Sequence, residues 1–250
     1  MKLAAAPSLL IIGDSLTLGA AEISANGSIL SCVKTCYVDR LRQAMPSITL
    51  ITDADVHRTS AGALDRLDGL LKQHRPDVVV FMIGANDADI DWKRFILSNG
   101  RVVRHRVSAD RYSHNLRELT GRTLAAGVVP VLYQFATHDL SRRGPYISKL
   151  VGRDLMPFIN ANGGQPESDA QFAKYHEALL DAARDLGVPI ALCAAAVGQP
   201  PSPLVCHDDG THLNDEGHRL VASVLLPVLA AALHAAERRP GSPAAAAAAQ

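Results

Sequence analysis

Four short polar segments of the chain together supply the groups that acyl transfer needs. A hydroxyl comes from Gly13-Asp14-Ser15-Leu16, a glycine N–H from Gly62, a side-chain amide from Gly84-Ala85-Asn86-Asp87, and a histidine with a carboxylate three residues earlier from Asp209-Gly210-Thr211-His212. A serine hydroxyl becomes a useful nucleophile only when a base lies within hydrogen-bond reach, and the oxygen that gains charge needs fixed donors. The four segments therefore predict nucleophilic acyl transfer if the fold brings them together.

Ser15 and His212 are the pair expected to carry the reaction. Ser15 would attack the acyl carbon while His212 takes its proton and later returns it to the leaving alcohol. A serine where a strand meets a helix is also a common N-cap, and Ser15 fits both roles. Asp209 is expected to orient the imidazole, with Asp208, four residues before the histidine, as the alternative. The predicted catalytic residues are thus Ser15, Asp209 and His212.

The charged oxygen of the intermediate is expected to meet three hydrogen-bond donors. They are the backbone N–H of Ser15, the backbone N–H of Gly62 and the side-chain amide of Asn86. Glycine at position 62 suits a loop with unusual dihedral angles, although an ordinary turn glycine fits as well. Asn86 is also a residue type that ties loop backbone together. Asp14 and Asp87 are expected to act as scaffolding for the neighbouring loop amides.

The elements that must position these groups are short apolar strands with helices between them. Five runs of four to six residues lack strict alternation, as parallel strands covered on both faces do: Leu9–Ile12, Ile48–Ile51, Val78–Ile83, Val128–Tyr133 and Val188–Leu192. Helical patterns cover Ala63–His74, Ala109–Ala126, Ala170–Leu186 and about Asp215–Glu237. The alternation predicts one α/β domain whose parallel sheet has helices on both faces. Each polar segment follows a strand, so all four are expected at the carboxyl edge of that sheet, where ligands bind.

These motifs resemble those of the SGNH, or GDSL, hydrolase family. Residues 13–16 match its nucleophile block, Gly62 its glycine block, residues 84–87 its GxND block and residues 209–212 its DxxH block, in the family's order. The resemblance implies a single-domain three-layer α/β/α sandwich with a five-stranded flavodoxin-like sheet of order 2-1-3-4-5. It also implies hydrolysis of esters or thioesters without a metal or other cofactor. Leu213 stands where many members have proline, a departure expected to affect loop rigidity more than chemistry.

Composition sets few limits on the partners. The 250 residues include 25 Lys+Arg and 25 Asp+Glu, so net charge predicts attraction neither to nucleic acid nor to a membrane. No apolar run is expected to be long enough to span a bilayer. Residues 93–122 carry eight Lys/Arg against two acidic residues, which fits either a basic rim for anionic substrates or a solvated surface. The expected partner is a small-molecule ester, and the oligomeric state is left open.

Domain boundaries and cysteines leave the cellular compartment undecided. Residues 1–237 are expected to form the hydrolase domain and residues 238–250, rich in Pro and Ala, a flexible tail. Two local disulfides, Cys32 with Cys36 and Cys193 with Cys206, would suit a secreted or periplasmic protein whose leader has been removed. Four free thiols would suit a cytoplasmic one.

The sequence thus predicts hydrolysis of a carboxylic ester through an acyl-enzyme on Ser15. A short acyl group is favoured, such as acetyl on a carbohydrate or another small alcohol. A thioesterase or lysophospholipase with the same triad is one alternative, and a catalytically inactive small-molecule-binding module is another. The long connections 88–107 and 138–166 are expected near the substrate; they contain Trp92, Phe95, His138, Arg142 and Arg143, among which no motif chooses.

Overall fold

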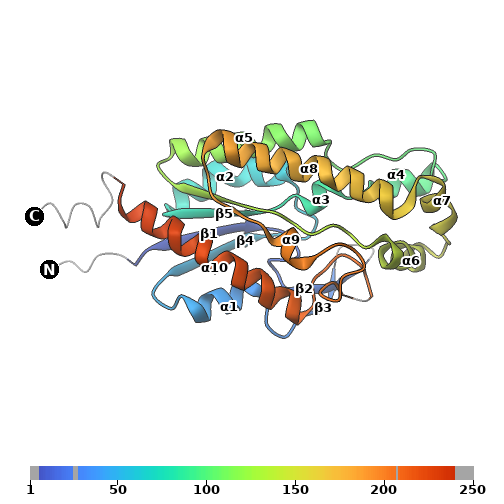
Figure 1. The fold of residues 1–250 in the computed structure, drawn as a ribbon, viewed down its shortest axis with the longest axis horizontal. Helices are drawn as coiled ribbons and strands as arrows, with labels where there is room; N and C mark the ends of the chain where they lie inside the picture. The colour runs from blue at the N-terminus through green and yellow to red at the C-terminus, as the bar shows by residue number, and fades with distance from the viewer. Residues whose placement is uncertain (1–5, 25–27, 207, 240–250) are drawn as a thin grey trace, which may run out of the picture.

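The centre of the fold is a sheet of five parallel strands. The computed structural model describes residues 6–24, 28–206 and 208–239. The strands are β1 (Ser8–Gly13), β4 (Thr49–Ala54), β5 (Val78–Met82), β6 (Val129–Tyr133) and β7 (Ile190–Ala191). Their spatial order is β4-β1-β5-β6-β7 (Figure 1). Counted among these five strands, that order is 2-1-3-4-5, so the predicted flavodoxin-like topology is confirmed.

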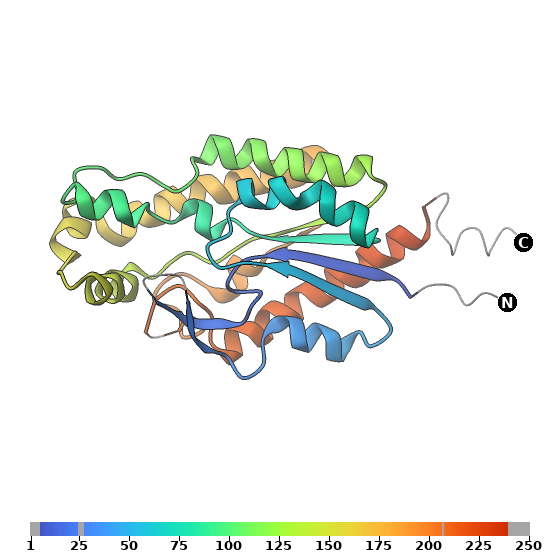
Figure 2. The same cartoon turned by 180° about the vertical axis from the view of Figure 1, so that it is seen from behind.

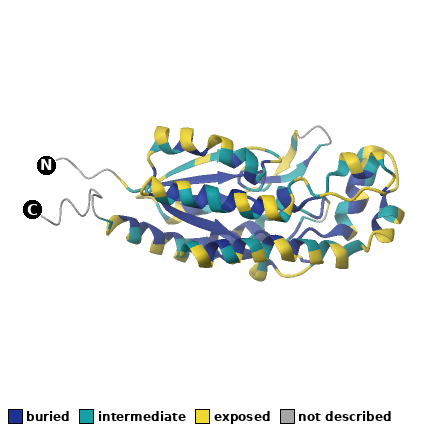
Figure 3. Cartoon of the chain, turned by 90° about the horizontal axis from the view of Figure 1, so that it is seen from above, coloured by how far each residue is buried: buried dark blue, intermediate teal, exposed yellow. Residues whose placement is uncertain are grey.

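The inner strands are buried on both faces, as their uninterrupted apolar runs predict. Every residue of β5 and β6 is buried, and Leu9–Ile12 of β1 are 0% exposed. Leu10 lies between Ile51 of β4 and Val79 of β5 in the register of the sheet. The strands form the buried middle of the molecule in Figure 3. Burying one such side chain stabilises a fold by about 1.5–3 kcal/mol, which makes this sheet a rigid base for the loops at its edge.

Helices cover both faces of the sheet and complete three layers (Figures 1 and 2). One layer contains α2 (Ser60–His74), α5 (Ala109–Ala125) and α8 (Gly164–Leu186), and the opposite layer contains α1 (Tyr37–Ala44), α9 (Cys193–Val197) and α10 (Asp215–Glu237). The four predicted helices are all present. The helix predicted from residue 170 begins earlier, at Gly164. Pro166 does not prevent this start, because it lies in the first turn of the helix, where proline is tolerated.

Two regions contain elements that the sequence did not indicate. An antiparallel hairpin, β2 (Ala20–Ile23) with β3 (Ile29–Cys32), follows β1. The two long connections contain short helices: α3 (Ala85–Ala88), α4 (Trp92–Leu97), α6 (Leu140–Val151) and α7 (Met156–Ala161). Of these helices, α4, α6 and α7 pack around a small apolar cluster of their own, with Phe95, Leu155 and Ile159 at its centre, whereas α3 packs on the main core. The connections are therefore folded structure beside the active edge.

Helix α10 corrects the expectation that no apolar run is long enough to span a bilayer. It has 23 residues, and an 18-residue window within it has a mean hydropathy of 1.8, with 33% of that window buried. By length and composition alone it is able to cross a membrane. Its buried residues Val221, Leu225 and Leu229 are 0% exposed, and the helix packs on β6 and α1. A helix that covers the sheet of a folded domain also meets this criterion of length and hydropathy.

The structure bears on two further expectations, the state of the cysteines and the end of the last helix. All four cysteines are free thiols, so the structure follows the unpaired alternative. Burial raises the pKa of Cys193 and of Cys206 to about 12, which disfavours their thiolate forms. Of the predicted tail 238–250, only residues 238 and 239 belong to the described part of the chain, and α10 ends at Glu237 as expected.

Candidate active site

Ser15 lies in a tight turn directly after β1. The turn closes because Thr17 N donates to Asp14 O at 3.0 Å and Leu16 N donates to the Asp14 carboxylate at 3.0 Å. Gly13 is required at the start of the turn, because a Cβ there would overlap the side chain of Thr17. Ser15 is 7% exposed and lines a cavity at the carboxyl edge of the sheet. Its hydroxyl is thus held at a fixed place in a largely buried site.

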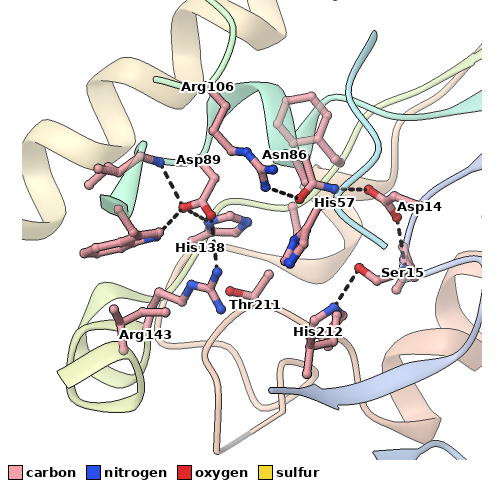
Figure 4. A pocket seen from close by; sticks show the side chains of 18 of the residues that line it. Asp14, Ser15, His57, Asn86, Asp89, Arg106, His138, Arg143, Thr211 and His212 are labelled. Carbon is pink, nitrogen blue, oxygen red and sulfur yellow. Dashed lines mark hydrogen bonds and ion pairs between the residues drawn. The ribbon is translucent and has the colours of Figure 1, made fainter. Parts of the chain in front are cut away.

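His212 and Asp209 meet Ser15 across 197 residues of chain. Ser15 Oγ lies 2.8 Å from His212 Nε2 (Figure 4). On the other side of the ring, His212 Nδ1 hydrogen-bonds to the Asp209 carboxylate. Asp209 is 0% exposed and also accepts the backbone N–H groups of Thr211 at 2.9 Å and His212 at 3.0 Å. The histidine tautomer with its proton on Nδ1 satisfies both bonds and leaves Nε2 free to take the serine proton. Hydroxyl, imidazole and carboxylate therefore stand in series.

The pKa of Asp209 reflects two opposing effects. Burial raises it, while the hydrogen bond from His212, the charge of His212 and the Thr211 N–H lower it, and the result is a pKa below the usual value. Because a lowered pKa keeps the group ionised at neutral pH, Asp209 is a carboxylate where it faces the imidazole.

The loop that carries Asp209 is fixed by close backbone contacts. Gly210 has φ +66°, and a Cβ at this position would overlap the backbone of Asp139 and Arg143. Asp139 N donates to Gly210 O at 2.8 Å, and Cys206 N donates to His212 O at 2.6 Å. Glycine is therefore needed here both for its dihedral angle and for lack of a side chain.

Asn86 enters the same site from α3, which follows β5 closely. The turn into α3 depends on Gly84, whose φ is +127° and whose Cβ would overlap Phe135. Asn86 Nδ2 donates to Asp14 Oδ2 at 3.0 Å, and Arg106 donates to Asn86 Oδ1 at 3.4 Å (Figure 4). These two bonds orient the amide, and its second N–H remains available to the cavity that Asn86 lines.

Asp14 and Asp87 are two of the buried carboxylates at this edge. Burial raises the pKa of Asp14 to about 6, against the hydrogen bonds from Leu16 and Asn86 and the charge of His212. Burial likewise raises the pKa of Asp87 to about 7, although Ser60 donates to it from both its N–H and its hydroxyl. The Asp87–Ser60 contact joins the start of α2 to α3, which supports the proposed scaffolding role.

The structure does not bring Gly62 to the cavity. Gly62 lies in the first turn of α2, where its N–H points to the N-cap Thr59 hydroxyl at 3.5 Å, and it is absent from the residues that line the cavity. His57, in the loop after β4, lines it instead and has φ +64°, a backbone conformation that residues other than glycine rarely adopt. Among the described residues, no acceptor takes the N–H of His57 or of Ser15. Two unpaired backbone donors thus lie at the cavity wall.

The cavity has a volume of about 510 Å³ and extends from Ser15 to the long connections. Of the five residues that the sequence left undecided there, Trp92, His138 and Arg143 line it, whereas Phe95 belongs to the apolar cluster and Arg142 donates to the backbone of residues 202 and 205. Asp89 was not identified from the sequence, because no motif includes it. It accepts hydrogen bonds from Trp92 at 3.0 Å and Arg143 at 3.2 Å. In the described part of the chain, no three His, Cys, Asp or Glu residues form a group able to hold a metal ion.

Fold and site together define a class of protein: a three-layer α/β/α sandwich that aligns a serine, a histidine and a carboxylate at the carboxyl edge of its parallel sheet. A family model, the GDSL-like lipase/acylhydrolase family, matches residues 11–220. The chain belongs to this family and is a carboxylic ester hydrolase.

Solved structures share the fold across nearly the whole chain. A lipase/acylhydrolase from Enterococcus faecalis is 18% identical, with 88% of this chain and 94% of that chain covered and a TM-score of 0.63. A catalytic mutant of Axe2, an acetylxylan esterase from Geobacillus stearothermophilus, is 18% identical, with 92% and 96% covered and a TM-score of 0.62. TesA is 18% identical, with 90% and 99% covered and a TM-score of 0.60. A search of curated proteins found no match to the chain.

Proposed function

We propose that this protein hydrolyses carboxylic esters through an acyl-enzyme on Ser15. Ser15 Oγ adds to the ester carbonyl carbon as its proton moves to His212 Nε2. The bond to the alcohol then breaks, and the same proton passes to the leaving oxygen. Water next adds to the acyl carbon, gives a proton to His212, and Ser15 takes that proton as the acid departs. The observation that supports this mechanism is the 2.8 Å approach of Ser15 Oγ to an imidazole whose other nitrogen bonds to buried Asp209.

Three donors are proposed for the charged carbonyl oxygen of the intermediate. The N–H of Ser15 and the oriented amide of Asn86 keep the roles expected from the sequence. The third is the N–H of His57, which is unpaired among the described residues and lies at the cavity wall, in place of the N–H of Gly62, which faces Thr59. Fixed donors of this kind stabilise the transition state without reorganising when the charge forms.

The proposed substrate is an ester with a short acyl group, such as acetyl on a carbohydrate or another small alcohol. One similar structure is an acetylxylan esterase, and cavity-lining Trp92 offers a flat apolar face of the kind on which a sugar ring packs. A thioesterase or lysophospholipase on the same three residues remains the enzymatic alternative.

Covalent labelling combined with a chain-length series tests this proposal. A p-nitrophenyl phosphonate ester is expected to add one phosphonyl group, located on Ser15 by peptide mass spectrometry. Hydrolysis of p-nitrophenyl acetate is expected to exceed that of the octanoate by about tenfold or more in kcat/KM, since each tenfold step needs only about 1.4 kcal/mol of selective binding. Preference for octanoate would favour a lysophospholipase. Hydrolysis without a phosphonyl group on Ser15 would contradict the acyl-enzyme on Ser15.

Asn86→Ala tests the proposed oxyanion contact. Loss of one preorganised donor is expected to lower kcat by about 10²–10³-fold with little change in KM, because the contact forms mainly in the transition state. Steady-state hydrolysis of p-nitrophenyl acetate provides both constants. Asn160→Ala, at an exposed position on α7, is the matched control and should keep wild-type kcat.

A second variant separates the two candidates for the third donor. Gly62→Pro removes the Gly62 N–H within the first turn of a helix, where proline is tolerated. It should keep kcat within about threefold, because a donor outside the cavity contributes no transition-state stabilisation. A loss as large as that of Asn86→Ala, with the melting temperature unchanged, would return the donor role to Gly62.

A further inference from the structure

The charged side chains that line the catalytic cavity are unequally paired. The cations are Lys93, Arg106 and Arg143, and the carboxylates are Asp14, Asp89 and Asp91. Three histidines and two tyrosines complete the titratable groups of the wall: His57, His138, His212, Tyr133 and Tyr146. Lys93 and Arg106 belong to the basic stretch 93–122, for which the sequence allowed either a rim for anionic substrates or a plain solvated surface.

Arg143 and its carboxylate neutralise each other. Arg143 donates to Asp89 at 3.2 Å, and both side chains are largely buried, at 11% and 6% exposure. Asp89 also takes the indole N–H of Trp92 at 3.0 Å and lies 3.5 Å from His138 Nδ1. Burial opposes the ionised form of Asp89, but the charges of Arg143 and His138 hold its pKa well below the usual range. The pair is therefore part of the wall and contributes little net charge.

The remaining carboxylates are also committed to other groups. Asp91 caps α4, accepting from Arg94 N at 3.2 Å, and pairs with the Arg94 side chain at 3.3 Å. Asp14 is occupied by Leu16 and Asn86. Lys93 and Arg106 are both exposed, and within the described residues neither has an ion-pair partner. Two cations at the cavity thus lack an ion pair within the part of the chain that the structure describes, although the charge of Arg106 also acts on Asp89.

Arg106 stands beside the reacting centre. Its only side-chain hydrogen bond among the described residues is the 3.4 Å contact to Asn86 Oδ1, so the rest of its guanidinium faces the cavity it lines (Figure 4). The pKa of His57 is lowered by burial and then by the positive charges of Arg106 and Arg143, with Asp89 opposing. The positive charges of Arg106 and Arg143 therefore act at this wall, close to the proposed oxyanion donors.

We infer that Arg106, assisted by Lys93, selects esters that carry an anionic group, in the first instance a carboxylate, near the scissile bond. A guanidinium suits a carboxylate because its planar donors match both oxygens. A group held there would be oriented by the same side chain that orients the Asn86 amide. This inference rests on the proposed function, because it needs turnover on Ser15.

Two matched pairs of esters test the inference. The anion lies on the alcohol side in 4-acetoxybenzoate against its neutral methyl ester, and on the acyl side in p-nitrophenyl hemiglutarate against p-nitrophenyl butyrate. The measured quantity is the anionic-to-neutral ratio of kcat/KM, each rate divided by its hydroxide-catalysed rate. In at least one pair the wild type is expected to favour the anion about tenfold or more, and 0.5 M NaCl should reduce that ratio because salt screens exposed charges.

Substitutions at Arg106 give the decisive comparison. Arg106→Gln should lower the ratio by about tenfold, Arg106→Lys should restore part of it, and Lys93→Gln should lower it by about two- to fivefold. Arg104→Gln is the control, because Arg104 is an exposed arginine two residues away that does not line the cavity. The ratio separates recognition of charge from any effect on Asn86, which would change both members of a pair equally.

The outcomes also separate this inference from the proposed function. A wild-type ratio near one in both pairs, or a ratio unchanged in Arg106→Gln, would overturn the inference while Ser15-dependent hydrolysis stands. Absence of Ser15-dependent turnover with all four esters would instead overturn the proposed function, and the inference with it.

Discussion

Ser15→Ala and His212→Ala are each expected to reduce kcat for p-nitrophenyl acetate by at least about 10³-fold, and by as much as about 10⁶-fold. Without the hydroxyl no acyl-enzyme forms, and without the imidazole the hydroxyl, 2.8 Å from Nε2, has no base. The two residues act as a unit, so the double variant should be hardly slower than either single one. Residual hydrolysis would reflect binding and the oxyanion donors alone.

Controls for this prediction come from the same residue types elsewhere in the chain. His114 is exposed on α5 and Ser223 is exposed on α10, so His114→Ala and Ser223→Ala should retain wild-type kcat. Circular dichroism melting curves of all variants should agree within a few degrees, because neither catalytic side chain belongs to the apolar core. Activity that survives either catalytic substitution unchanged would rule out Ser15 and His212 as nucleophile and base.

The parts of the site that the sequence predicted are those that short-range chemistry and sheet topology determine together. Ser15 and Asn86 each follow a buried strand closely, and parallel strands place their carboxyl ends at one edge. The prediction of Asp209 and His212 needed, in addition, only the three-residue spacing between them. Two apolar strands and a motif are thus enough to predict a contact across 197 residues of chain.

Gly62 is the one predicted oxyanion donor that the structure does not place at the cavity. A glycine near the end of a strand suggests free dihedral angles, but Gly62 lies in a regular helical turn. The unusual conformation belongs instead to His57, five residues earlier, with φ +64°. A positive φ at a histidine depends on the tertiary fit of the loop, and local propensity gives no sign of it.

The helices within the long connections were not predicted, for a related reason. Gly144 and Pro145 are unfavourable in helix interiors, so local propensity gives no sign of α6. Tyr146 and Ile147 bury their side chains on the small apolar cluster, and that packing outweighs the weak helix propensity. Arg106 was counted within a basic stretch, but only the fold distinguishes it from its neighbours by placing it at the cavity.

Asp209→Asn is the second substitution expected to have a very large effect, with kcat lowered by about 10⁴-fold. The carboxylate accepts from His212 Nδ1 and remains ionised at neutral pH because its pKa is lowered. An amide removes that charge and is able to donate to Nδ1, which would put the imidazole proton on Nε2 and block proton transfer from Ser15. The loss should appear in kcat, with KM for p-nitrophenyl acetate nearly unchanged.

Asp208→Asn is the matched control, since it neutralises the adjacent carboxylate that the sequence left as the alternative. Asp208 is exposed, whereas Asp209 is fully buried and hydrogen-bonds to the imidazole. The control should therefore keep kcat within about threefold, because an exposed charge near solvent acts weakly on the site. A large loss in Asp208→Asn together with a small one in Asp209→Asn would transfer the role to Asp208. Equal small losses would mean that the imidazole is oriented by the loop backbone and not by either carboxylate.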